Sequence, residues 1–257
     1  MAGVHRVAQQ GFRANVQAYE TARPSFPADA IAQIVSLLRP DSQILDVGAG
    51  TGKFTRLLAS KCGYANVQAV EPVEEMRECF QTAVPGVCVQ DGSADFLPLP
   101  DSSMDCITCA QAFHWFANTG SLREFRRVLK PGGLLVLIWN LEDGRTPWVH
   151  SLRTLYEQHE QGTPQFRLGL WKHVWEGQEA QEWFQPLQQR SYDWTFGLTK
   201  GQAWQRVLSK SYISCLDAPT QAQLQQQCQA VLQDVPTRPD GTMEYPHTTT
   251  LVWTTSK

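Results

Sequence analysis

A glycine-rich turn follows a short apolar segment, and its residue types could hold a nucleotide-like ligand. Residues 46–53 read Asp-Val-Gly-Ala-Gly-Thr-Gly-Lys. A phosphate-binding P-loop requires a glycine and a hydroxyl residue where Val47 and Phe54 stand. The dinucleotide fingerprint G-x-G-x-x-G requires its third glycine at Lys53. The turn therefore favours close backbone approach to a ligand that lacks a pyrophosphate, since glycine leaves the space of a side chain open.

A carboxylate stands at a matching position after the next predicted strand. Glu71 follows Gly48 by 23 residues and comes directly after the predicted strand 67–70. Its two oxygens can accept hydrogen bonds from the two hydroxyls of a ribose. The alternative is an ordinary carboxylate stabilised by the dipole of the following helix. Because parallel strands present their carboxyl ends at one edge of a sheet, the turn and Glu71 are predicted to form one ligand site.

The elements that position these residues alternate between strands and helices through the first 140 residues. Short apolar runs predict strands, and apolar residues at helical spacing predict the helices between them. The predicted strands are 43–47, 67–70, 87–90, 104–109 and 134–139, and the predicted helices are 28–38, one after Gly52, one starting at Pro72 and one that carries Leu122, Phe125 and Leu129 and ends at Lys130. This alternation predicts a doubly wound, mostly parallel α/β sheet.

Residues after Asn140 differ in composition and lose the regular alternation. Residues 151–257 contain 17 Gln, and seven of the nine Trp lie after Asn140. Helices are predicted at 146–161 and 220–233, and strands at 187–196 and 248–255. We predict a single domain over 1–257, made of an N-terminal helical cover (1–40), a cofactor-binding core (41–140), and a part that completes the sheet and caps the site (141–257).

Charge and hydropathy exclude several classes of protein. The 22 Lys and Arg against 25 Asp and Glu give a net charge of −3, without the positive field that nucleic-acid or anionic-membrane binding needs. No apolar run approaches the ~18 residues that cross a bilayer, and the first fifteen residues lack a signal-peptide core, so a cytoplasmic location is expected. Cys106 and Cys109 lie inside a predicted strand, which favours buried thiols over a zinc or redox site.

Five motifs, in chain order, resemble those of class I S-adenosylmethionine-dependent methyltransferases. They are residues 46–52, 71–72, 92–98, 110–116 and 129–133, and the resemblance spans roughly residues 12–140. It implies a Rossmann-like methyltransferase fold, with a seven-stranded sheet, an antiparallel closing strand and a helical cap. Within that superfamily, Tyr19-x-x-x-Arg23-Pro24 and His114-Trp-Phe resemble the trans-aconitate methyltransferase-like branch, which methylates small molecules.

Position by position, the resemblance implies a site for S-adenosyl-L-methionine. Asp46, Gly48, Ala49 and Gly50 would surround the methionine part of the cofactor, and Glu71 would hold its ribose.

The resemblance places the adenine and the methyl end of the cofactor beside loops that come later in the chain. Ser93 and Ala94 would border the adenine. Ser93 replaces an aspartate that is common in the superfamily, and Asp95 either substitutes for it or faces solvent. Gln111 would face the methionine and the methyl group. Because metal-dependent members tend to place a carboxylate at the position of Gln111, no metal ion is expected.

Two residues before the sheet would close over the cofactor. Arg23 would pair with the cofactor's carboxylate through a charge-assisted hydrogen bond, and Tyr19 would cover it. The alternatives are a surface cation for Arg23 and a core-packing ring for Tyr19.

The expected reaction is a direct in-line displacement in which the protein mainly orients the reactants. A carboxylate acceptor is already ionised at neutral pH, whereas a hydroxyl or amine needs a general base. His114 would act either as that base or as a positioning residue in an aromatic wall. The acceptor is expected to be a small molecule. The alternatives are a noncatalytic S-adenosylmethionine-binding protein and an NAD(P)-dependent oxidoreductase, which Lys53 in place of the third glycine disfavours.

Overall fold

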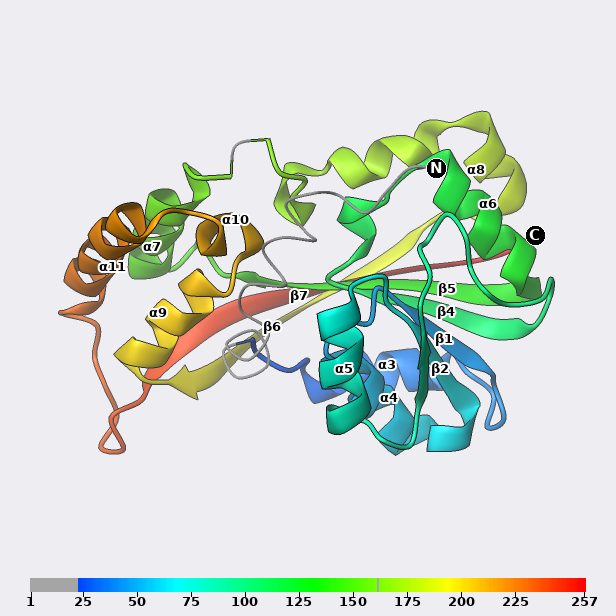
Figure 1. The fold of residues 1–257 in the computed structure, drawn as a ribbon, viewed down its shortest axis with the longest axis horizontal. Helices are drawn as coiled ribbons and strands as arrows, with labels where there is room; N and C mark the ends of the chain where they lie inside the picture. Colours follow the sequence, from blue (N-terminus) through cyan, green and yellow to red (C-terminus); the bar gives the residue numbers. More distant parts are fainter. Residues whose placement is uncertain (1–22, 161) are drawn as a thin grey trace.

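A seven-stranded sheet forms the centre of the computed structural model, which describes residues 23–160 and 162–257 (Figure 1). The strands are β1 (Ile44–Val47), β2 (Val67–Val70), β3 (Cys88–Gln90), β4 (Met104–Ala110), β5 (Leu129–Glu142), β6 (Gln188–Leu198) and β7 (Met243–Thr255). Their order is β3-β2-β1-β4-β5-β7-β6. The first five strands are parallel, and β7 pairs antiparallel with both β5 and β6. This confirms the predicted mostly parallel sheet with an antiparallel closing strand.

Helices cover both faces of the sheet. The helices are α3 (Ala28–Ser36), α4 (Lys53–Cys62), α5 (Glu74–Ala83), α6 (Thr119–Val128), α7 (Pro147–Glu157), α8 (Gln178–Trp183), α9 (Lys200–Leu208), α10 (Ser211–Ser214) and α11 (Ala218–Leu232). Buried residues of α3, α4 and α5 share one core cluster, and those of α6 and α8 share another on the opposite face.

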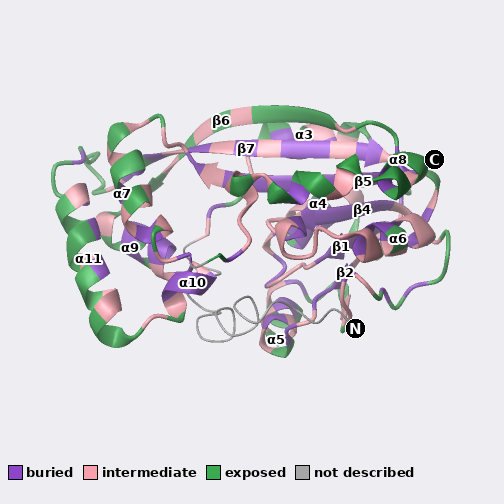
Figure 2. Ribbon diagram, turned by 90° about the horizontal axis from the view of Figure 1, so that it is seen from above, coloured by how far each residue is buried: buried purple, intermediate pink, exposed green. Residues whose placement is uncertain are grey.

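The side chains of β5 contribute to the hydrophobic cores on both faces of the sheet. Leu135, Leu137 and Trp139 belong to the core under α6 and α8, whereas Leu134, Val136 and Ile138 belong to the core under α3, α4 and α5. Successive side chains of a strand point to opposite faces, so a strand covered on both sides is apolar throughout. Figure 2 shows buried residues along β4 and β7, whereas β6 at the edge of the sheet is mostly intermediate or exposed.

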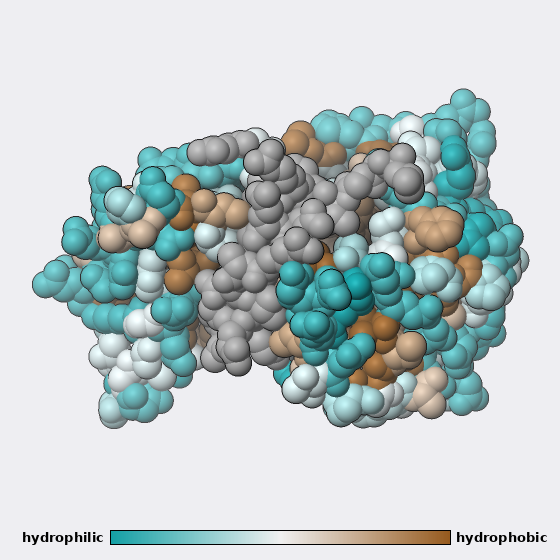
Figure 3. All heavy atoms as spheres, in the orientation of Figure 1, coloured by the Kyte–Doolittle hydropathy of each residue, from teal (hydrophilic) through white to brown (hydrophobic). Residues whose placement is uncertain are grey.

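The remaining helices form a cap beyond the carboxyl ends of the parallel strands. Figure 1 shows α7, α9, α10 and α11 gathered on the left, away from the helices that flank the sheet. They enclose a third core cluster, which includes Leu152, Trp204 and Leu224. Figure 3 shows mostly hydrophilic side chains on the visible face of the cap. No helix in the described ranges is long and apolar enough to span a membrane.

Several element boundaries differ from those predicted, among them those of α5, β5 and α7. Helix α5 begins at Glu74, after an extended Val73, so Pro72 lies before the helix and not at its first position. Leu129 already has extended backbone and begins β5. Helix α7 ends at Glu157 and does not reach residue 161.

The tryptophans of the later half do not all fill the cap. Trp171, Trp175 and Trp183 pack against the sheet core, next to Phe113 and Phe184. The segment 166–184 therefore folds back over the sheet.

Candidate functional site

The glycine turn lies at the carboxyl end of β1 and contacts the next strand. The backbone N–H groups of Gly48 and Ala49 both donate to the carbonyl of Val70. Gly48 and Gly50 have φ angles of 69° and 58°, the left-handed region that glycine adopts without strain. A Cβ at Gly48 would lie 2.9 Å from the Cβ of Ala112, whereas a Cβ at Gly50 would meet no described atom within 4 Å. The turn is therefore packed against protein at Gly48 and open at Gly50.

Glu71 joins the glycine turn to the end of β2. Its Oε2 accepts from the backbone N–H of Gly50 and its Oε1 accepts from that of Val73, both at 2.9 Å. A carboxylate has about four acceptor sites, so further lone pairs remain for two hydroxyl donors. Burial raises the pKa of Glu71 to about 7, against the lowering effect of its backbone hydrogen bonds. The residues present therefore fit the ribose of S-adenosylmethionine.

Asp46 lies behind the turn and does not line the site. It is 0% exposed, and its two oxygens accept from the hydroxyls of Thr55 and Thr108 at 2.6 and 2.9 Å. Burial raises its pKa to about 6. The expected contact of Asp46 with the methionine part is thus replaced by an indirect role, in which it ties β1 to α4 and β4.

The loop after β3 places Ser93 and Ala94 differently from each other. Ser93 is half-buried and bridges to Phe96, whereas Ala94 is buried in the core. Asp95 accepts from the hydroxyl of Ser121 at 2.8 Å. Asp95 therefore anchors the loop to α6, which neither of its two predicted roles anticipated.

A narrow cleft runs from the glycine turn to the end of β4. It is lined by Arg23, Pro24, Phe26, Gly48, Ala49, Thr51, Lys53, Phe54, Ala110 and Gln111. The Nζ of Lys53 donates to the carbonyl of Arg23 and so fixes the segment that covers the turn. Arg23 thus lies where a cofactor-covering residue is expected, and its Nη2 donates to the carbonyl of Ser209 in the cap at 3.1 Å. Tyr19 lies outside the described residues.

Gln111 adopts a strained backbone where the cleft meets a second cavity. Its φ is 57°, which is uncommon for a residue with a side chain and costs on the order of 1–3 kcal/mol. Its backbone N–H donates to the carbonyl of Ile138, and its Nε2 donates to that of Asn140. Both bonds hold Gln111 against β5. Such strain concentrates at functional sites.

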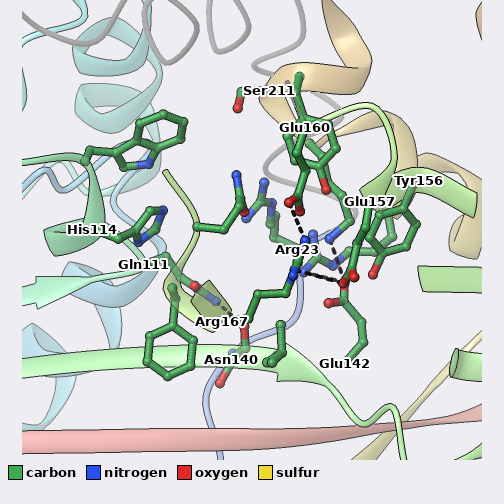
Figure 4. A pocket seen from close by; sticks show the side chains of 17 residues that line it. Arg23, Gln111, His114, Asn140, Glu142, Tyr156, Glu157, Glu160, Arg167 and Ser211 are labelled. Atoms are coloured by element: carbon green, nitrogen blue, oxygen red, sulfur yellow. Dashed lines mark hydrogen bonds and ion pairs between the residues drawn. The ribbon is translucent and has the colours of Figure 1, made fainter. Parts of the chain in front are cut away.

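The second cavity lies between the sheet and the cap, and Arg23 and Gln111 line it as well as the cleft. We refer to this second cavity as the acceptor cavity. Figure 4 shows Gln111 and His114 on one side of it, and Tyr156, Glu142 and Glu157 on the other. Its charged residues are Arg23, Arg167, Arg206, Lys210, Glu142, Glu157 and Glu160.

Two cations share one buried carboxylate oxygen in this cavity. The Oε1 of Glu142 lies 2.9 Å from Nη2 of Arg206 and 3.0 Å from Nζ of Lys210. The side chains of Glu142 and Arg206 are only 1% and 2% exposed. Burial lowers the pKa of Lys210 to about 7, against the attraction of Glu142. The two nearby cations hold the pKa of Glu142 well below its usual range despite burial.

His114 is half-buried and lines the acceptor cavity next to Trp115. Its Nδ1 accepts from Nε1 of Trp139 at 3.1 Å. Burial, with the positive charge of Arg23, lowers the pKa of His114 to about 3. The imidazole is therefore neutral at physiological pH.

The sequence interpretation named Arg23 but missed the other charged residues of the acceptor cavity. Glu142 had a signal, because it follows the fifth predicted strand at the sheet edge where ligands bind. Arg206 and Lys210 flank the end of α9 and meet Glu142 only through the tertiary fold. In the described ranges, no three His, Cys, Asp or Glu side chains are grouped as a metal site.

Comparison with known proteins identifies the family. A model described as a methyltransferase domain matches residues 45–137. An uncharacterised methyltransferase of Mycobacterium tuberculosis is 35% identical over 210 residues, which cover 82% of this chain and 79% of that protein. The chain belongs to the methyltransferase family. S-adenosylmethionine is the methyl donor that this family implies.

A further relative and a solved structure extend the comparison of this methyltransferase. An uncharacterised methyltransferase-like protein of Schizosaccharomyces pombe is 38% identical over 169 residues, and the chain spans 65% of its length. The crystal structure of a putative type II methyltransferase from Anaeromyxobacter dehalogenans superposes with a TM-score of 0.64 at 19% identity, covering 90% of this chain and 97% of that one. The last comparison supports the fold alone.

Proposed function

We propose that this protein transfers a methyl group from S-adenosylmethionine to a small-molecule acceptor, with a carboxylate oxygen as the nucleophile. The observation that carries the proposal is that Arg23 and Gln111 line both the cleft beside the glycine turn and the acceptor cavity. A donor in the cleft and an acceptor in the cavity would thus meet at Gln111. The resemblance to the trans-aconitate methyltransferase-like branch also supports a small acceptor.

The charge of the acceptor cavity favours an anion. Arg23, Arg167, Arg206 and the protonated form of Lys210 oppose three carboxylates, Glu142, Glu157 and Glu160, so the net formal charge with Lys210 protonated is 4 − 3 = +1. Buried charge is costly unless it is compensated. An acceptor carboxylate would supply the compensating charge and would be ionised at neutral pH without a general base.

The residues of the chain would act by orientation and electrostatics. S-adenosylmethionine, when bound, supplies an electrophilic methyl group. Glu71 and the backbone of the glycine turn would hold the ribose and the adjoining part of S-adenosylmethionine. Gln111 would lie between the bound cofactor and the acceptor. Arg23 and His114 would orient the acceptor oxygen for in-line attack. Such orientation can supply ~7–11 kcal/mol of the barrier.

The test is transfer of labelled methyl groups from S-adenosylmethionine into a small-molecule extract of cells. We expect a labelled product that releases volatile methanol on mild alkaline treatment, because methyl esters hydrolyse and N- or S-methyl groups do not. An alkali-stable product would overturn the carboxylate assignment. Complete silence across broad extracts, with the cofactor still bound, would favour a noncatalytic binding protein.

A further inference from the structure

A buried tryptophan donates a hydrogen bond to the ring of His114, which lines the acceptor cavity. Trp139 lies on β5, is 0% exposed, and its ring stacks on Phe166 with centroids 4.5 Å apart. Its Nε1 lies 3.1 Å from Nδ1 of His114. Trp171 packs against both rings of this pair, with its centroid 4.8 Å from that of Trp139 and 6.0 Å from that of Phe166. The stack holds the indole rigidly, so the position of its N–H group is fixed.

The chemistry of the two rings then determines where the imidazole proton lies. An indole N–H can only donate a hydrogen bond. Nδ1 of His114 must therefore carry a lone pair, and in a neutral imidazole the proton then resides on Nε2. Among the described residues, no second group hydrogen-bonds the ring, and His114 lines the cavity. Nε2–H is thus the group available to a bound acceptor.

We propose that Trp139 is a positioning residue that fixes His114 as the Nε2–H tautomer, so that His114 donates a hydrogen bond to an acceptor oxygen and does not remove a proton from the acceptor. The acceptor half of this proposal rests on the proposed function, whereas the tautomer does not. We therefore expect the protein to methylate nucleophiles that are already deprotonated when they bind, because neither ring nitrogen of His114 is free to act as a base. The low pKa of His114 is consistent with this assignment.

The tautomer can be read directly from imidazole nitrogen resonances of protein labelled with ¹⁵N-histidine. The chain has six histidines. The signal of His114 is assigned as the one that is absent from the spectrum of the His114→Gln variant. In the wild type we expect an unprotonated Nδ1 and a protonated Nε2 at His114. A protonated Nδ1 at His114 in the wild-type protein would overturn the proposal.

Two tryptophan variants separate the hydrogen bond from packing. Trp139→Phe removes the donor, and we expect the His114 signals to shift to a mixture of tautomers. Trp171→Phe is the matched control, because it removes an indole from the same stack whose Nε1 has no hydrogen-bond partner in the described structure. It should leave the His114 tautomer unchanged. An unchanged tautomer in Trp139→Phe would contradict the positioning role.

Acetate, the smallest carboxylate probe, tests donation to an acceptor without requiring turnover. In the presence of S-adenosylhomocysteine, acetate should shift the His114 Nε2–H proton saturably, and Trp139→Phe should weaken that response at least about threefold. No response in the wild type would overturn the donor role. The expected response without methyl transfer to any metabolite would instead support the donor role and refute the proposed function.

Discussion

Glu71 combines a structural and a ligand-binding task in one side chain. Its oxygens accept from Gly50 and Val73, so the carboxylate shapes the glycine turn before any ligand arrives. The same burial that makes these bonds strong also raises its pKa to about 7. Its protonation is therefore expected to change within the physiological range.

Binding of S-adenosylmethionine should weaken as the pH falls through about 7. A protonated Glu71 loses acceptor capacity for the ribose hydroxyls, and its ionised fraction falls about tenfold per pH unit below the pKa. We expect the Kd from calorimetry to rise by about fivefold between pH 7 and pH 6, because the ionised fraction falls from about a half to about a tenth. Glu71→Gln should bind weakly with no such slope, while exposed Glu74→Gln should behave as wild type. The same slope in Glu71→Gln would assign the titration to another group.

Lys210 should make stability depend on pH in the alkaline range. Its pKa is lowered from 10.5 to about 7, so the unfolded chain binds more protons between these values and the free energy of unfolding rises with pH there. One such proton gives a slope of up to about 1.4 kcal/mol per pH unit. Urea unfolding at pH 7, 8 and 9 should show this rise in wild type and in Lys200→Met, but not in Lys210→Met. Parallel curves for all three would show that Lys210 is an ordinary lysine.

The strand ends bring together residues that lie far apart in the sequence. Apolar period and glycine position were sufficient to predict β1 to β5. Strands β1, β2, β4 and β5 contribute buried side chains to the cores on both faces, so their apolar runs can be read locally, whereas β3 at the edge is partly exposed. The same reading placed the glycine turn, Glu71 and Gln111 at one sheet edge. It could not find the contact of Lys210 with Glu142, since 68 residues separate them and the cap lacks a repeating pattern. The resemblance implied that Asp46 contacts the methionine part, whereas the structure buries Asp46 with its two oxygens hydrogen-bonded to Thr55 and Thr108.

Two alanine substitutions in the glycine turn should have different effects. Gly48→Ala combines left-handed strain with a 2.9 Å contact to Ala112, so we expect a loss of about 2–3 kcal/mol in the free energy of unfolding. Gly50→Ala meets open space and should lose only about 1 kcal/mol. Its main effect should be at least tenfold weaker binding of S-adenosylmethionine. Equal stability losses, or unaltered binding in Gly50→Ala, would contradict this description of the turn.

One strand connects the three hydrophobic cores of the molecule. Met243 and Tyr245 of β7 belong to the cap core, whereas Leu251 and Val252 belong to the cores on the two faces of the sheet. The cap is therefore not attached by a linker but shares a strand with the sheet. The single domain over 1–257 stays a prediction, and the shared strand is the reason to expect that the cap and the sheet unfold together.

A cavity made in the cap should destabilise the whole molecule. Leu224 is buried in the cap core, and Leu224→Ala is expected to cost about 2–5 kcal/mol. Urea unfolding followed by tryptophan fluorescence and by circular dichroism should give coincident curves, both shifted by the substitution. Leu170→Ala, on an exposed side chain, should change stability by less than about 0.5 kcal/mol. Separate transitions, with only one shifted, would show that the cap unfolds independently.

The most direct test of the account is the choice between S-adenosylmethionine and NAD, measured by calorimetry on the wild-type protein. The glycine turn with Lys53 at its end, together with Glu71, predicts micromolar binding of S-adenosylmethionine and no measurable binding of NAD. Binding of NAD without S-adenosylmethionine, or binding of neither, would contradict it.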